Sequence, residues 1–126
     1  MAPTLLVDDR LLVIRSAVLT RCFPARGQIV VFTAEAKNPE GGSSRRRMVK
    51  RVAATGGDSI LVGDNLLADG VCEPKRVDVP AGGVCVLGDN RRVSRDSREY
   101  GCIPSRQVTG LVLLVVWPLR RARVVR

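Results

Sequence analysis

Lys50 stands in an unusual setting for a basic side chain. It is one of three lysines among 21 Lys and Arg residues, and it lies in the run RMVKRVAATGGD (47–58), between Val49 and Arg51. A lysine in water, with a pKa of about 10.4, stays protonated at neutral pH, whereas burial among apolar side chains lowers that pKa. Arginine cannot be deprotonated in this way. If Lys50 is buried among the neighbouring valines, its amine can become neutral and accept a proton; the alternative is a lysine that extends from a strand edge to water.

A second stretch that contains residues capable of taking part in chemistry is VPAGGVCVLGDNRRVSRDSREYGCIP (79–104). Its segment Gly88-Asp89-Asn90 ends an apolar run in a polar turn, and Ser94, Asp96 and Arg98 follow within a few residues. Taken by itself, this pattern is also typical of a surface loop with an Asx turn and an Asp96–Arg98 ion pair.

Histidine is absent from the chain, which excludes Ser-His-Asp and Cys-His nucleophile systems and the usual zinc sites. The four cysteines, Cys22, Cys72, Cys85 and Cys102, include no C-x-x-C pair, so we expect no metal and no cofactor. Four cysteines allow three disulfide pairings, between which the sequence does not choose, and buried free thiols are slightly favoured over any of them.

The chain is strongly basic, with a formal net charge of +9 and a pI near 10.7. Such a charge indicates an anionic partner, either nucleic acid or the headgroups of a membrane. Only 3% of the residues are aromatic, which leaves little surface on which bases could stack. We therefore expect the membrane surface rather than nucleic acid.

The length of 126 residues predicts a single domain, 1–126, and the short apolar runs predict an all-β fold. The expected strands are 10–14, 27–32, 48–54, 59–62, 65–69, 84–88 and 110–117. Residues 111–117 read as a buried strand that is far too short to cross a bilayer, and no signal peptide or spanning helix is present.

The connections between these strands are also predicted. Gly63-Asp64-Asn65 should form a hairpin turn, and residues 36–47 should form a long exposed loop whose Arg45–Arg47 run is a solvated basic patch. A short helical turn is expected at 104–108. The basic segment PLRRARVVR (118–126) could attach to an anionic leaflet, and a solvated, disordered tail is an equal alternative.

Four segments together resemble the type I signal peptidases, membrane-bound serine endopeptidases with a Ser/Lys dyad. MAPTLL (1–6) is similar to the end of the nucleophile box S-M-x-P-T-L, and GQIVVF (27–32) to G-D-[IV]-V-V-F, with Gln28 in place of Asp. VKRVAATGGD (49–58) matches V-K-R-V-x-x-x-x-G-D, and GDNRRVSRDSREYG (88–101) matches G-D-N-R-x-x-S-x-D-S-R-x-x-G. These segments span almost the whole chain, and the last of them is highly specific.

The resemblance implies roles for particular residues. Lys50 corresponds to the general base and Ser94 to the serine that orients its amine. Three residues support the site structurally without being catalytic: Asp89, Asp96 and Arg98. The remnant of the nucleophile box consists of Met1, Pro3 and Thr4. Thr4 is no substitute for the nucleophile, so the catalytic serine and the membrane anchor are expected upstream of Met1.

The resemblance also implies a fold, a substrate and a location. The fold would be the β-sheet or barrel domain of signal peptidases with one long flexible loop. The substrates would be preprotein signal peptides with small residues before the cut, processed at the extracytoplasmic face of the cell membrane. The alternatives are a narrowly specific maturation peptidase, a catalytically inactive relative, and a basic β-module that binds lipid headgroups or nucleic acid.

Overall fold

A computed structural model describes residues 1–18, 24–37, 43–62 and 75–125 of the chain, and β-strands dominate these residues. The strands are β1 (Arg10–Arg15), β2 (Ile29–Lys37), β3 (Ser43–Thr55), β4 (Ser59–Val62), β5 (Lys75–Asp78), β6 (Gly83–Leu87), β7 (Ile103–Pro104), β8 (Val108–Trp117) and β9 (Arg123–Val124). Helical structure in the same residues is limited to the short α1 (Ser97–Tyr100) and the 3-10 turns η1 (Ser16–Val18), η2 (Ser105–Gln107) and η3 (Leu119–Arg121). The predicted all-β fold class is thereby confirmed.

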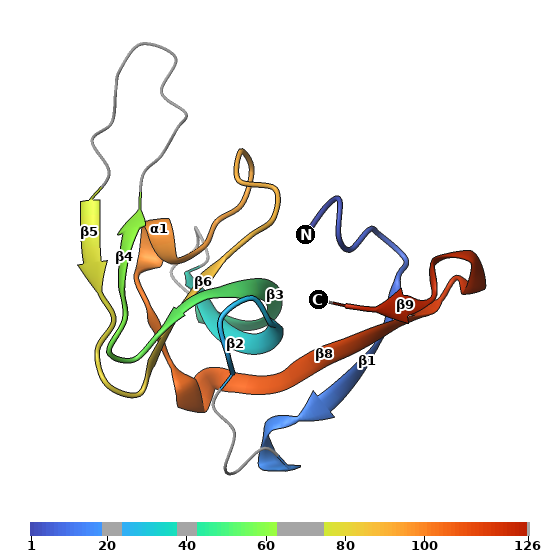
Figure 1. The fold of residues 1–126 in the computed structure, drawn as a ribbon, viewed down its shortest axis with the longest axis horizontal. Coiled ribbons are helices and arrows are strands. Elements are labelled where there is room, and N and C mark those ends of the chain that lie inside the picture. The colour runs from blue at the N-terminus through green and yellow to red at the C-terminus, as the bar shows by residue number, and fades with distance from the viewer. Residues whose placement is uncertain (19–23, 38–42, 63–74, 126) are drawn as a thin grey trace.

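The strands form one large sheet and a small hairpin (Figure 1). The sheet has the order β1-β8-β2-β3-β6-β7, with β9 added beside β8, and all of its pairs are antiparallel. A separate two-stranded antiparallel sheet pairs β4, which closely follows β3, with β5. This order sets the lysine strand β3 next to β6, from which the turn that carries Ser94 departs.

The core is largely aliphatic, as the low aromatic content requires, and two of its three clusters include residues of β6. All five residues of β6 are buried. The central cluster includes Val30, Phe32, Val52 and Val86, each almost wholly inaccessible to water. Because β6 is covered on both sides, the polar turn that begins at Gly88 starts from the interior of the domain. A polar group in this position needs hydrogen-bond partners within the protein.

Most of the expected elements are present. Strands occur at 10–14, 27–32, 48–54, 59–62, 84–88 and 110–117, with boundaries shifted by a few residues, and η2 confirms the helical turn at 104–108. The expected strand 65–69 and the hairpin turn at 63–65 lie outside the described residues. In the described chain, no helix has the length and hydrophobicity that crossing a bilayer requires.

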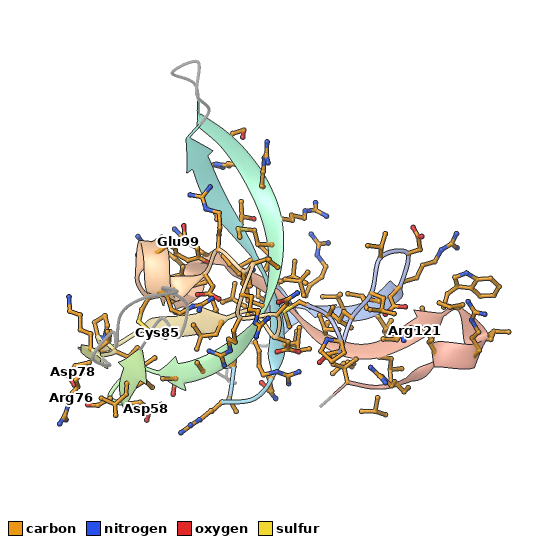
Figure 2. The ribbon with its side chains drawn as sticks, turned by 90° about the horizontal axis from the view of Figure 1, so that it is seen from above. Asp58, Arg76, Asp78, Cys85, Glu99 and Arg121 are labelled. Atoms are coloured by element: carbon orange, nitrogen blue, oxygen red, sulfur yellow. A yellow bond between two sulfur atoms is a disulfide. The ribbon has the colours of Figure 1, made fainter. Side chains whose placement is uncertain are left out.

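The prediction of a loop was wrong for residues 36–37 and 43–47, while residues 38–42 lie outside the described part of the chain. Strand β2 continues to Lys37 and β3 begins at Ser43, with Ala36 paired to Ser44. The antiparallel ladder extends through residues whose composition favours a turn, because register with a long partner strand outweighs local propensity. This hairpin projects from the body of the domain (Figure 2), and Arg45–Arg47 are exposed on it, as a solvated basic patch requires.

Two expectations about the end of the chain are also corrected. Strand β8 is buried only in part, because Leu113, Val116 and Trp117 are 36%, 40% and 49% exposed. An antiparallel strand such as β8 can expose one face to solvent along part of its length. The segment after it is not a disordered tail: residues 118–125 contain η3 and β9, and the Val125 N–H donates to the Leu113 carbonyl at 2.8 Å.

Candidate active site

Lys50 and Ser94 meet between β3 and the turn that follows β6. The Lys50 Nζ donates a hydrogen bond to the Ser94 Oγ at 2.6 Å, and both residues are half-buried. Burial lowers the pKa of the Lys50 amine below its ordinary value. The Asp96 carboxylate opposes that effect on the pKa, and the Arg98 guanidinium reinforces it. The amine is therefore held by a hydroxyl in an environment where it loses its proton more readily than in water.

Gly88 allows the backbone to pass very close to this pair. A Cβ built on Gly88 would overlap both side-chain atoms of Ser94 and would lie 3.3 Å from the Lys50 Nζ. Glycine is required here for space rather than for an unusual backbone angle. The glycine at the start of the GDNR segment thus has a physical reason in the packing of the candidate site.

Substituting Gly88 by alanine should separate Ser94 from Lys50. We expect the Gly88→Ala variant to lose about 1–3 kcal/mol of unfolding free energy, because a methyl group is forced into filled space. Urea unfolding measures this loss. Adding Ser94→Gly to the same variant removes the overlapping atoms and should recover part of the stability. An unchanged urea midpoint in Gly88→Ala would contradict the packing described here.

Asp96 is the centre of the turn, and its side chain is fully buried. Its carboxylate accepts hydrogen bonds from the Gly88 N–H at 2.9 Å, from the Arg98 N–H at 3.2 Å and from the Arg98 Nε at 2.9 Å. Burial by itself would raise the pKa of Asp96, but the bonds from Arg98, Gly88 and Ser94 outweigh it and lower that pKa. Asp96 therefore stays ionised, caps the start of α1 and joins the turn to the end of β6.

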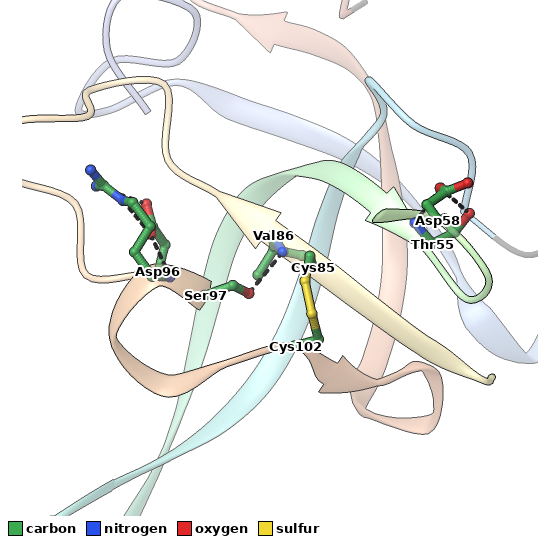
Figure 3. The surroundings of a disulfide bond; sticks show 8 residues. Thr55, Asp58, Cys85, Val86, Asp96, Ser97 and Cys102 are labelled. Atoms are coloured by element: carbon green, nitrogen blue, oxygen red, sulfur yellow. Dashed lines mark hydrogen bonds and ion pairs between the residues drawn. A yellow bond between two sulfur atoms is a disulfide. The ribbon is translucent and has the colours of Figure 1, made fainter. Parts of the chain in front are cut away.

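Arg98 and Ser97 complete the attachment of the turn. The Arg98 Nη2 donates to the carbonyls of Arg91 and Ser94, at 2.7 and 3.1 Å, so the guanidinium spans the turn. The Ser97 Oγ accepts the Val86 N–H of β6 at 2.9 Å (Figure 3). The side chains of Asp96 and Ser97 thus accept two backbone N–H groups of the β6 segment, those of Gly88 and Val86.

Asp89 organises a second network beside the first. Its carboxylate receives the Arg51 guanidinium in a bidentate pair, with both N···O distances at 2.9 Å, and it accepts the Thr4 hydroxyl. Arg51 also donates to the Gly27 carbonyl at 2.7 Å. Burial by itself would raise the pKa of Asp89, but the hydrogen bonds from Arg51 and Thr4 outweigh burial and lower that pKa. The first residues of the chain are thereby fixed next to the strand that carries Lys50.

A disulfide joins Cys85 of β6 to Cys102 after α1 (Figure 3), so the expectation of free thiols was wrong for this pair. The cause is the register of β6 and β7, in which Val84 pairs with Ile103 and the neighbouring cysteines face one another. The bond closes a segment with a sequence separation of 17, which corresponds to a stabilisation of about 3 kcal/mol. That segment contains the whole GDNRRVSRDSREYG sequence. Cys22 and Cys72 lie outside the described residues.

The structure brings most of the expected site residues into these two networks. Lys50, Ser94, Asp96 and Arg98 belong to the first. Thr4 and Asp89 belong to the second. Met1 packs against an apolar cluster that includes Leu5 and Ile29, while Pro3 is exposed.

Sequence reasoning missed Arg51 and Ser97 as structural partners and left the effect of Gln28 open. Arg51 follows Lys50 in the V-K-R-V segment and pairs with Asp89, while Ser97 stands in the D-S-R segment. The fixed identity of both positions in the quoted patterns was the available signal. Gln28, where the pattern has Asp, accepts the Ala25 N–H at 2.8 Å and so closes a turn before β2, as a carboxylate also can.

Comparison with known proteins defines the class of the chain. The family described as "Signal peptidase, peptidase S26" matches residues 1–76 and 69–117. Similar proteins include the signal peptidase I of Leptolyngbya laminosa, 33% identical over 96% of this chain, and the mitochondrial ATP-independent inner membrane protease subunit 1b of Arabidopsis thaliana, 39% identical over 77%. Another is the probable thylakoidal processing peptidase 2 of Arabidopsis thaliana, 36% identical over 94% of this chain. The class is that of peptidases. The chain belongs to the signal peptidase family, peptidase S26.

The matches cover only part of the relatives. The chain spans 66%, 53% and 36% of the lengths of these three proteins. A signal peptidase I from Enterococcus faecalis V583 is a similar solved structure, with a TM-score of 0.49 and 25% sequence identity over 70% of this chain and 95% of that one.

Proposed function

We propose that the protein removes N-terminal signal peptides from exported preproteins with a Ser/Lys dyad. In this proposal, the nucleophile is a serine directly before Met1 and the general base is Lys50. The observation that carries the proposal is the contact of Lys50 Nζ with Ser94 Oγ at 2.6 Å, with the pKa of the amine lowered by burial. Ser94 fixes the direction of the amine, and the Asp96 turn fixes Ser94.

The proposed reaction is acyl transfer in two steps. The neutral Lys50 amine takes the proton of the serine hydroxyl, and the serine oxygen attacks the carbonyl carbon of the last signal-peptide residue, with backbone N–H donors at the developing oxyanion. The peptide C–N bond breaks, and the leaving amine takes the proton from Lys50. A water molecule, deprotonated by Lys50, then hydrolyses the ester and regenerates the serine.

The test is the isolation of the native protein from its cells, with its intact mass and N-terminal sequence determined. We expect a serine before Met1 and cleavage of a preprotein after a small residue, with N-terminal sequencing of the product locating the cut. As a control, replacing that small residue by phenylalanine should block cleavage. A native protein that begins at Met1 or Ala2 and cuts no preprotein would overturn the proposal in favour of an inactive relative or a binding module.

We further propose that the protein works at the extracytoplasmic face of the cell membrane, with one end of the domain against the lipid. Exposed apolar side chains gather on the paired end of β8 and β9 and on η3. They are Val116, Trp117, Leu119 and Val124. Exposed Arg120 and Arg123 stand among them, and this mixture of apolar and basic groups suits an anionic bilayer interface.

This contact can be measured because Trp117 is the single tryptophan of the chain. We expect its fluorescence to shift to shorter wavelength on addition of vesicles that contain phosphatidylglycerol, with a much smaller shift for phosphatidylcholine alone. Each arginine near the surface would contribute about 1 kcal/mol at low salt. Replacing Leu119, which is 74% exposed, by aspartate should abolish the shift. The proposed surface would be refuted if Leu119→Asp kept the full fluorescence shift, or if the two vesicle types gave equal shifts.

A further inference from the structure

Two arginines near the end of the chain hold its first residues. The Arg123 Nη2 donates to the Thr4 carbonyl at 2.7 Å, across 119 positions of sequence. The Arg121 guanidinium forms a bidentate pair with Asp9, with N···O distances of 2.9 and 3.0 Å. The N-terminal segment, residues 1–9, is therefore tied to the C-terminal segment, residues 118–125, at two points.

Asp9 is a buried anchor within the N-terminal segment. Its side chain is 2% exposed, and besides Arg121 it accepts the Leu6 N–H at 2.9 Å. The Asp9 N–H in turn donates to the Leu6 carbonyl at 3.3 Å, so two hydrogen bonds between Leu6 and Asp9 close the turn formed by residues 6–9. The hydrogen bond from Arg121 lowers the pKa of Asp9, which keeps the anchor ionised at neutral pH. The position of this turn is thus coupled to the guanidinium of Arg121.

The C-terminal segment is itself fixed to the main sheet by strand pairing and a hydrogen-bonded turn. Strand β9 pairs with β8, with Val124 opposite Leu114 and Arg123 opposite Val115. The Arg121 N–H closes the 3-10 turn by donating to the Pro118 carbonyl at 2.8 Å. Figure 1 shows the N-terminal coil passing β9 on its way to β1, and Figure 2 shows Arg121 at this end of the domain. The two arginines therefore extend from the main sheet rather than from a loose end.

We propose that Arg121 and Arg123 are positioning residues for the nucleophile, an inference that rests on the proposed function. Thr4 is held on its side chain by Asp89 and Arg51, and on its carbonyl by Arg123. These contacts fix the backbone three residues after Met1. A serine joined to Met1 reacts only if it remains within reach of Lys50, and a small misplacement of a reacting atom slows catalysis severely. The C-terminal arginines thus narrow the positions that the serine can occupy.

The first test follows the N-terminal segment itself, without reference to activity. Amide hydrogen exchange of Leu5 and Leu6 is expected to be at least tenfold faster in Arg121→Gln and Arg123→Gln, while the exchange of β3 amides changes little. The control is Arg120→Gln, which alters an exposed neighbour in the same turn. Unchanged exchange in both variants would overturn the inference.

The second test uses preprotein cleavage by the native protein. We expect kcat to fall about tenfold in each variant, with KM and the pH profile unchanged, because Lys50 and its surroundings are untouched. Arg123→Lys keeps a donor for the Thr4 carbonyl and should restore most of the rate. Faster exchange with an unchanged kcat would overturn the positioning role. If the unsubstituted protein cuts nothing, the proposed function fails, and the exchange result alone decides whether the N-terminal segment is held.

Discussion

Replacing Lys50 by methionine is expected to lower the rate of preprotein cleavage by roughly 10² to 10⁴-fold, the usual contribution of a general base. Methionine keeps the length and the apolar stem of lysine but has no amine to accept a proton. The fold should survive, because the substitution removes a half-buried cation whose pKa is already lowered by burial. The measurement is cleavage of a preprotein by the native protein and its variant, together with urea unfolding of both.

Arginine at the same position separates proton transfer from charge. Lys50→Arg retains a cation next to Ser94, yet its guanidinium stays protonated, so this variant should be as inactive as Lys50→Met. A matched control is Lys75→Met, which removes an exposed lysine from β5 and should leave cleavage unchanged. Near-normal activity in Lys50→Arg would mean that the site needs a positive charge rather than a base.

The same assignment predicts a pH profile. Only the neutral amine accepts a proton, so the rate should rise with pH and level off above the pKa of Lys50. Because burial lowers that pKa, the midpoint of the rise should lie below 10.5, the ordinary value for lysine. Initial rates across the alkaline range measure this. A rise centred on the ordinary lysine value would contradict burial as the activating influence.

The sequence was sufficient to predict the fold class because the signal lay in local chemistry. Short aliphatic runs separated by Gly, Pro and Asp predicted the strand that contains Lys50 and the strand that ends directly before Gly88. The quoted patterns also predicted that Ser94 would lie near the lysine, although the two residues are 44 positions apart. No local periodicity contains such a contact. It depends on the pairing of β3 with β6, which only the three-dimensional arrangement supplies.

What sequence reasoning missed depends on long-range register. Composition predicted a loop over 36–47, whereas the ladder of β2 and β3 continues through most of it. The Cys85–Cys102 bond follows from the alignment of β6 with β7, and the Arg121–Asp9 pair from the passage of the chain ends along one another. Four cysteines and eighteen arginines offer too many partners for spacing alone to select.

Replacing Asp96 by asparagine should produce the largest loss of stability in the candidate site. Asp96 is fully buried, Arg98 is 8% exposed, and the neutral amide would leave the guanidinium without its countercharge. Removing one partner of a buried ion pair typically costs about 3–5 kcal/mol. Since small domains are stable by only about 5–15 kcal/mol, much of the protein's stability depends on this carboxylate. Urea unfolding of the unsubstituted protein and the variant, each with the Cys85–Cys102 disulfide intact, measures the difference.

The exposed pair of Arg76 and Asp78 provides a matched control, because its members are also two residues apart. Their side chains are 71% and 77% exposed, and Asp78→Asn should change the urea midpoint very little.

The dependence of stability on acid pH provides a second criterion. The folded-state pKa of Asp96 is lowered, so its stabilisation is complete above the unfolded value near 3.8 and is lost as pH falls through the folded value. Asp96→Asn should remove that part of the acid sensitivity, and because the lost carboxylate also aligns Ser94, cleavage should slow even where the variant remains folded. A variant that kept full stability and full activity would show that the turn holds Ser94 against Lys50 without its buried ion pair.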